Sequence, residues 1–162
     1  MRPECRTAKS LSISPKIRYR QNVSHKSEKI AGLIQSLEGK DLDAHYLGYF
    51  ECFNRQLFFE AHEVLEELWL AERGGSNHLF YKGLIQLAGA FVHIQKGRPR
   101  PALALLQLAQ ANLDEYGDIH QSLNLEQVRI LMRSWKTGLE NEQENGARPP
   151  HKCWPRISLI NS

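Results

Sequence analysis

The chain has 162 residues, of which 41% are hydrophobic, and its formal net charge is +3 at pH 7. This length suits one globular domain with tails and is too short for two domains of ordinary size. The sequence has no apolar run of the roughly 20 residues that span a bilayer, and its first residues lack the apolar core of a secretory signal. Its three cysteines, Cys5, Cys52 and Cys153, form no C-x-x-C pair and are expected to be reduced. We therefore expect a soluble, cytoplasmic protein with no membrane association.

Residues 1–27 are predicted to form a basic tail without regular structure, because they are polar and show no sustained periodicity. Residues 1–26 carry seven basic side chains and one acidic side chain, Glu4. The segment has only Tyr19 to stack on a base and fits no nucleic-acid-binding fold, which argues against a nucleic-acid partner. Its serine-rich, acid-poor composition is also typical of an organelle transit peptide, so import into a plastid is the alternative location.

Residues 28–141 are predicted to form an all-α domain, a compact bundle of about five helices with mostly antiparallel neighbours. The short loops and the absence of sustained period-two alternation favour this architecture. Apolar spacing and stop signals place a short first helix over 27–37 and longer ones over 43–55, 57–72, 79–96, 101–116 and 124–139. Asn124 is expected to cap the last helix, because Gln127 follows three residues later.

Residues 142–162 are predicted to form a tail, and the stretch 142–155 contains three prolines that are incompatible with a regular helix. The tail is nevertheless expected to pack against the domain. Its apolar side chains are costly to leave in water, and they are Trp154, Ile157, Leu159 and Ile160.

The helix expected over 57–72 carries the residues with the most chemistry. Five of its side chains fall within an arc of about 100° and form the core-facing stripe: Leu57, Ala61, Val64, Leu65 and Leu68. His62, Glu66, Trp69 and Phe59 lie beside that stripe, whereas Glu63 falls further round the helix. His62 and Glu66 are one turn apart and are expected at the margin of the core, partly shielded by the two aromatic rings.

Imidazole and carboxylate one turn apart are a common start of a site for a divalent metal such as zinc. A third ligand is available from the helix over 79–96, where Gln86 and His93 share a face with the small residues Gly83, Gly89 and Ala90. Small residues let a neighbouring helix approach, so we infer that this face meets the His62 face. The candidate metal ligands are His62, Glu66 and His93, with Trp69, Gln86 and Phe59 in support, and Glu63 is the candidate general base.

Two structural alternatives stay open. His62 and Glu66 also have the spacing of a hydrogen-bonded pair that satisfies its polar groups at a packed interface. Cys52 is a candidate nucleophile, or a small core residue between Phe50 and Phe53. A zinc protease is not indicated, because Glu66 stands where the second histidine of the H-E-x-x-H pattern is required.

Residues 58–69 with the preceding Phe53-Asn54, and residues 81–93, resemble the family catalogued as domain of unknown function 309. Its hallmark is a histidine, a glutamate four residues later and an aromatic residue three further on, which His62, Glu66 and Trp69 match. The resemblance covers about residues 43–139. It implies an all-helical fold without an established activity and a suggested metal-binding role. Members commonly carry a glycine in the turn before this helix, where the chain has Arg55-Gln56.

A second class of function is a helical scaffold or protein-binding module. Ala102, Leu106 and Ala109 follow Ala90 at spacings that are similar to a tetratricopeptide helix pair, although no second repeat follows. In that interpretation His62 and Glu66 form a structural latch, and the partner is another protein or a second copy of the chain.

Overall fold

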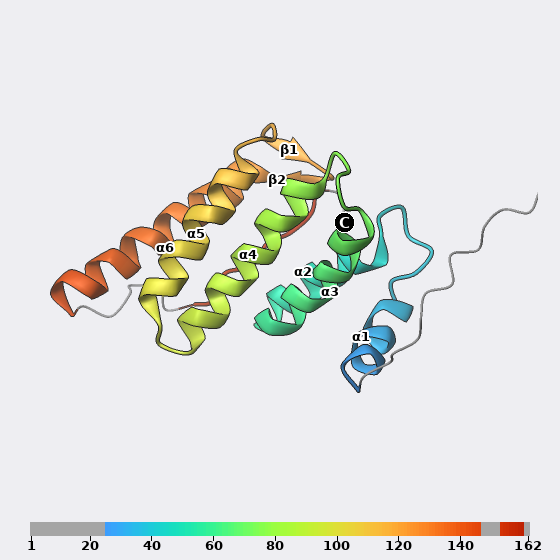
Figure 1. The fold of residues 1–162 in the computed structure, drawn as a ribbon, viewed down its shortest axis with the longest axis horizontal. Coiled ribbons are helices and arrows are strands. Elements are labelled where there is room, and N and C mark those ends of the chain that lie inside the picture. The colour runs from blue at the N-terminus through green and yellow to red at the C-terminus, as the bar shows by residue number, and fades with distance from the viewer. Residues whose placement is uncertain (1–24, 147–152, 161–162) are drawn as a thin grey trace, which may run out of the picture.

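The structure is a computed structural model that describes residues 25–146 and 153–160, and these residues form six α-helices and one two-stranded hairpin (Figure 1). In chain order the elements are α1 (His25–Gln35), α2 (Ala44–Asn54), α3 (Phe58–Ala71), α4 (His78–Gln95), α5 (Pro99–Leu113), β1 (Ile119–His120), β2 (Leu123–Asn124) and α6 (Leu125–Asn145). The predicted helical bundle is confirmed. Residues 1–24 of the expected basic tail lie outside the described residues. Among the described helices, none has the length and apolar character needed to cross a membrane.

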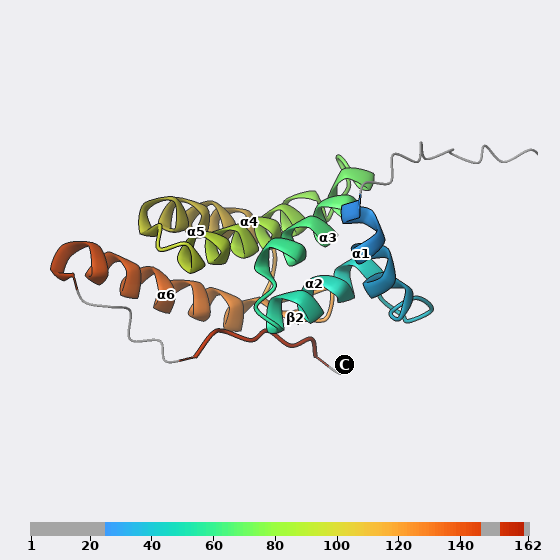
Figure 2. The same cartoon turned by 90° about the horizontal axis from the view of Figure 1, so that it is seen from below.

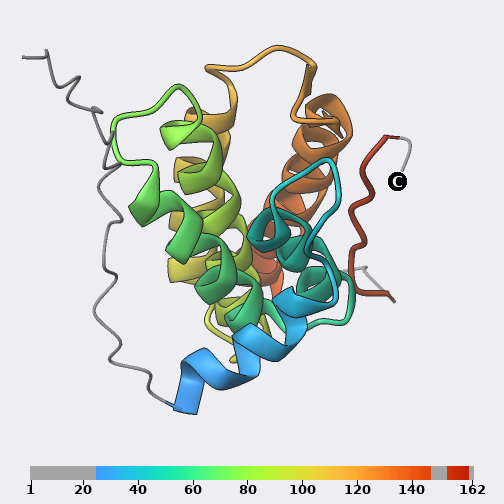
Figure 3. The same ribbon diagram turned by 90° about the vertical axis from the view of Figure 1, so that its right-hand side faces the viewer.

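The helices lie in two layers (Figure 2). One layer consists of α3, α4 and α5, with α4 in the middle because it packs against both of the others. The other layer contains α2, which packs on α3, and α6, which packs on α5. The end-on view in Figure 3 shows α1 crossing the end of the bundle beside α2. Because α4 lies in the middle of its layer, one of its faces packs on α3 and another packs on α5. Each candidate residue on α4 can therefore meet either neighbour.

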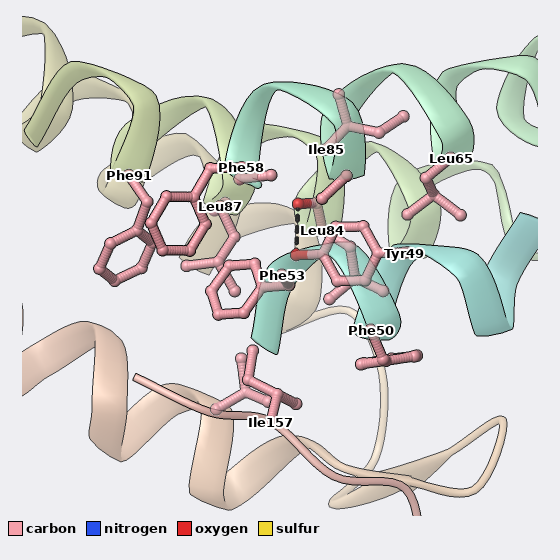
Figure 4. Close-up of a cluster of buried hydrophobic side chains, with 14 of the residues drawn as sticks. Tyr49, Phe50, Phe53, Phe58, Leu65, Leu84, Ile85, Leu87, Phe91 and Ile157 are labelled. Carbon is pink, nitrogen blue, oxygen red and sulfur yellow. Dashed lines mark hydrogen bonds between the residues drawn. The ribbon is translucent and has the colours of Figure 1, made fainter. Parts of the chain in front are cut away.

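Aromatic side chains fill the space between the layers (Figure 4). The ring of Phe53 from α2 meets that of Phe58 from α3 with centroids 4.9 Å apart, and Phe58 lies 5.1 Å from Phe91 of α4. The hydroxyl of the fully buried Tyr49 donates a hydrogen bond to the carbonyl oxygen of Leu84, 2.9 Å away. Burial raises the pKa of Tyr49 well above its ordinary value, so this phenol is a neutral donor that fixes α2 against α4.

Helix ends follow the sequence signals in two places and depart from them in a third. The Asp43 carboxylate accepts from the backbone N–H groups of His45 and Tyr46, which caps α2. Asn124 accepts from the N–H of Gln127 at 3.0 Å, as predicted for the cap of α6. The prediction that residues 142–145 are not helical is wrong, because α6 continues to Asn145 and ends at Gly146 with a φ of 65°. Its last turns are polar and give no apolar periodicity, yet no proline interrupts them.

The C-terminal segment 153–160 packs on the bundle, as predicted for Trp154, Ile157 and Leu159, whereas the fourth expected residue, Ile160, is 37% exposed. Ile157 and Leu159 are buried, and the indole of Trp154 stacks on Trp135 at a centroid distance of 5.9 Å. Asn54 at the end of α2 holds the segment with two hydrogen bonds, because its amide donates to the carbonyl of Ile157 at 2.8 Å and its carbonyl accepts from the N–H of Ile157 at 2.7 Å. The segment therefore forms one wall of the core (Figure 4).

The hairpin of β1 and β2 was not predicted. It pairs Ile119 with Asn124 and His120 with Leu123, and two-residue strands are too short to show an alternation of polar and apolar side chains.

Candidate functional site

His62 lies where α3, α4 and α5 come together. Its neighbours Ala61, Val64 and Leu65 on α3 are fully buried, which confirms the predicted core stripe, and the His62 side chain is half-buried at its margin. A Cβ placed on Gly89 of α4 would lie 3.9 Å from Cδ2 of His62 and 3.3 Å from Cδ1 of Leu105 on α5. The missing side chain at Gly89 therefore leaves space into which α3 and α5 both project a residue.

Two imidazole nitrogens on these facing helices are buried without a hydrogen-bond partner in the described part of the chain. They are Nδ1 of His62 on α3 and Nδ1 of His93, one turn after Gly89 on α4. A buried polar atom that makes no hydrogen bond costs about 1–3 kcal/mol, and most such atoms in folded proteins are paired. The facing helices α3 and α4 thus each carry one buried imidazole nitrogen without a hydrogen-bond partner among the described residues.

The side of the α3–α4 pair that carries His62 and His93 is called the α3–α4 face. Trp69 and His78 lie at its other end. Their rings lie 5.1 Å apart at an angle of 31°, and the guanidinium of Arg73 lies 5.9 Å from the Trp69 ring. Trp69 Nε1 and His78 Nδ1 are also buried without a hydrogen-bond partner among the described residues. The indole therefore covers the first turn of α4. His78 was missed in the sequence, although a short loop between antiparallel helices places the first residue of α4 beside the last turn of α3.

Gln86 and Gly83 meet α5, which corrects the inference that their whole face meets α3. The side-chain carbonyl of Gln86 accepts a hydrogen bond from the amide of Asn112 at 2.7 Å. A Cβ on Gly83 would lie 2.7 Å from Cγ of Leu113. Small residues in a sequence indicate that some helix approaches closely, but they do not show which helix it is. Because α4 has a neighbour on each side, the sequence could not distinguish α3 from α5. Asn112 could not be identified as the partner from spacing alone.

The remaining candidates divide between the core and the surface. Glu63 is buried with an exposed fraction of 6%, so it lies closer to the core than its position on the helical wheel indicated. Phe59 is 55% exposed, so most of its ring lies outside the core. Cys52 is fully buried, which agrees with the core alternative. Glu66 is half-buried one turn after His62.

No group of three or more His, Cys, Asp or Glu side chains within residues 25–146 and 153–160 is arranged to hold a metal ion. The three candidate ligands therefore do not form a closed metal centre as they stand. What the geometry does provide is two imidazole nitrogens without partners among the described residues, a carboxylate one turn after His62, and close packing of His62 and Leu105 over Gly89.

Residues 46–112 match the sequence model of the family described as domain of unknown function (DUF309), which confirms the resemblance over most of α2 and nearly all of α3, α4 and α5. An uncharacterized protein of Aquifex aeolicus (strain VF5) is 29% identical over 81 residues, which are 50% of this chain and 24% of that protein. The matched region thus spans about a quarter of the relative's length. No solved structure matches the chain.

Proposed function

We propose that the α3–α4 face binds a divalent metal ion such as zinc, with His62, Glu66 and His93 as its protein ligands. The observation that carries this proposal is the pair of buried imidazole Nδ1 atoms, on His62 and His93, that lack hydrogen-bond partners in the described part of the chain. A neutral imidazole with its proton on Nε2 presents Nδ1 as a lone pair, which is the form that binds zinc. Coordination would remove the cost of leaving both atoms unpaired.

The donor set fits an ion of intermediate softness. Two nitrogens with one carboxylate suit zinc, and the same set also accommodates iron, manganese or nickel. Because no three-ligand group is preformed among the described residues, one or more of the three side chains would have to change rotamer when an ion binds, with water in the remaining positions. Such an open site would have moderate affinity, since part of the binding free energy goes into ordering those side chains.

Glu63 is retained as the candidate general base should the bound ion carry a reactive water. It is buried and adjacent to His62 in the sequence. The proposal names no substrate, because the donor set fixes the kind of ion and leaves the reaction open.

A second candidate function is a protein-binding scaffold in which His62 and Glu66 form a structural latch. Two large apolar side chains favour it, because Phe59 on α3 and Leu108 on α5 are 55% and 52% exposed. Phe59 precedes His62 by three residues and Leu108 follows Leu105 by three, so both project near the face that His62 and Leu105 share across Gly89. In this reading, a partner protein or a second copy of the chain would cover the same face.

Elemental analysis tests the metal proposal. The full chain is purified without a metal-affinity step, with a His62→Ala/Glu66→Ala double variant beside it. The matched control is His45→Gln, because both ring nitrogens of His45 have carboxylate partners, Asp43 at 3.2 Å and Glu67 at 3.4 Å. We expect near-stoichiometric metal in the wild type and the control, and little in the double variant. If the folded wild type takes up no metal from added zinc, the metal proposal is rejected and the protein-binding scaffold is the remaining candidate.

A further inference from the structure

A cavity separate from the His62 face lies between α2 and the C-terminal segment. Its volume is about 340 Å³, and its apolar lining includes Leu47 and Phe50 of α2 with Ile157 and Leu159 of the segment. Figure 4 labels Phe50 on α2 and Ile157 on the segment that runs below it. Small-molecule sites occupy about 300–1,000 Å³, so this cavity suits a compact ligand of metabolite size.

The wall that the C-terminal segment provides is fixed by backbone pairing. Asn54 holds both the N–H and the carbonyl of Ile157. Further along, Leu159 forms an antiparallel bridge with Leu123, and the N–H of Ile160 donates to the carbonyl of Ser122 at 2.7 Å. These contacts set the cavity in place before a ligand arrives, and a preformed site spends little binding free energy on ordering.

Positive charge dominates the polar lining. Lys40 before α2, Arg55 after α2 and Arg156 in the C-terminal segment line the cavity together with one carboxylate, that of Glu51. None of the four forms an ion pair with any other residue that the structure describes. A cation at the C-terminal end of a helix interacts favourably with the helix dipole. This accounts for the position of Arg55 at the end of α2, but not for Lys40 or Arg156. Lys40 and Arg156 come from other segments, so the gathering of three cations is a property of the cavity.

We propose that this cavity binds a small amphiphilic anion, with a carboxylate or phosphate head against Lys40, Arg55 and Arg156 and an aliphatic body against Leu47 and Ile157. Charge decides the sign of the ligand, because three cations and one carboxylate attract an anion and repel a cation. Volume limits the ligand to a short chain, and the apolar lining distinguishes it from a bare inorganic ion.

The test compares three probes that share one aliphatic chain. Octanoate, octyl phosphate and octylamine are titrated into the full chain by isothermal calorimetry. We expect both anions to bind and octylamine to bind at least about ten-fold more weakly, since reversing the head charge turns attraction into repulsion. Octanoate and octylamine binding equally well, or neither anion binding, would overturn the proposal.

Variants with opposite expected effects locate the binding. Arg55→Gln/Arg156→Gln is expected to weaken octanoate binding about five-fold, whereas Glu51→Gln is expected to strengthen it about two-fold, in line with the modest strength of exposed charge pairs. Arg98→Gln/Arg100→Gln at the start of α5 is the control and should change nothing. All these side chains are exposed, so the fold is retained. Unchanged binding in the Arg55/Arg156 variant, or an equal loss in the control, would contradict the site.

A final arm separates a free ligand from a lipid surface. The chain is mixed with phosphatidylglycerol vesicles and sedimented. We expect it to stay in the supernatant, because the cavity admits one short chain and the other half of a phospholipid would remain outside. Cosedimentation that Arg55→Gln/Arg156→Gln abolishes, with no binding of free octanoate, would reject the small-molecule proposal in favour of a membrane headgroup.

Discussion

His62 of α3 lies against the bare backbone of Gly89 on α4, 3.9 Å from the position that a Cβ would occupy. The space that this glycine leaves is the link between the packing of three helices and the proposed binding face.

Gly89→Ala should stabilise the fold while weakening the site. Alanine in a helix is favoured over glycine by about 0.8–1.0 kcal/mol, and the closest contact, Leu105 Cδ1 at 3.3 Å, is the end of a flexible, half-buried side chain that can move aside. The new methyl group would occupy space beside the His62 imidazole. We expect a gain of about 0.5 kcal/mol in urea unfolding and a several-fold weaker zinc affinity. Unchanged zinc affinity would show that the space at Gly89 plays no part in binding.

Gly83→Ala is the matched substitution on the face that meets α5, and it should destabilise. The added Cβ would lie 2.7 Å from Cγ of Leu113 and 3.2 Å from the backbone oxygen of Ala109, and a backbone atom cannot step aside without moving α5. Overpacking of this kind costs about 1–3 kcal/mol, which exceeds the gain in helix propensity. Urea unfolding checks the loss, and equal stability of Gly83→Ala and the wild type would contradict the close α4–α5 approach.

Gln56→Gly should raise the free energy of unfolding by about 1 kcal/mol. Left-handed backbone costs a non-glycine residue about 1–2 kcal/mol, and glycine removes that cost. The greater flexibility of glycine in the unfolded chain offsets part of the gain. Gln56 has a φ of 64° in the turn that leads into α3. Gln35→Gly in α1 is the control and should destabilise, since it lies in helical backbone. Thermal unfolding measures both variants, and a destabilised Gln56→Gly would contradict the strained turn.

Asn54→Ala should release the C-terminal segment. The change leaves the N–H and the carbonyl of Ile157 without partners, at an expected cost of about 2–3 kcal/mol in urea unfolding. Asn141→Ala on the exposed side of α6 serves as the control with no expected effect. Hydrogen exchange at the Ile157 amide gives the local readout, and protection that persists in Asn54→Ala would show that other contacts hold the segment.

The His120 imidazole should make the protein less stable in mild acid. Burial lowers its pKa below the usual 6.5, and its Nε2 lies 2.8 Å from Oδ1 of Asn77. As the pH falls below about 6.5, the unfolded chain takes up a proton that folded His120 resists, so the free energy of unfolding falls until the folded pKa is passed; above pH 7 the contribution is constant. Urea unfolding between pH 7.5 and 5 should therefore have a smaller pH slope in His120→Asn, and identical slopes would refute the assignment.

The helices could be placed from the sequence because apolar spacing is local. Ala61, Val64 and Leu65 repeat at helical intervals, and the Asn124 cap needs only the three residues that follow it. Contacts that depend on the arrangement of whole helices could not be placed. The hydrogen bonds between Asn54 and Ile157 join positions 103 residues apart, and nothing local marks either residue as the partner of the other.

In the candidate site too, spacing along one helix could be predicted from the sequence, whereas contacts between helices could not. The His62, Glu66 and Trp69 spacing follows from helical geometry, so their common side of α3 was evident. Which of the two neighbours of α4 meets Gln86 depends on the order of helices within the layer, and Asn112 on α5 takes that contact. The unpaired nitrogens of His62 and His93 became visible only when burial was known.

The most direct measurement of the central proposal is the zinc K-edge X-ray absorption spectrum of the full chain loaded with one equivalent of zinc. The proposal predicts two imidazole nitrogens at about 2.0–2.1 Å with oxygen ligands completing the shell, and loss of one imidazole in His93→Gln. A shell of oxygen ligands alone, or one that His62→Gln and His93→Gln leave unchanged, would contradict a metal site on the α3–α4 face.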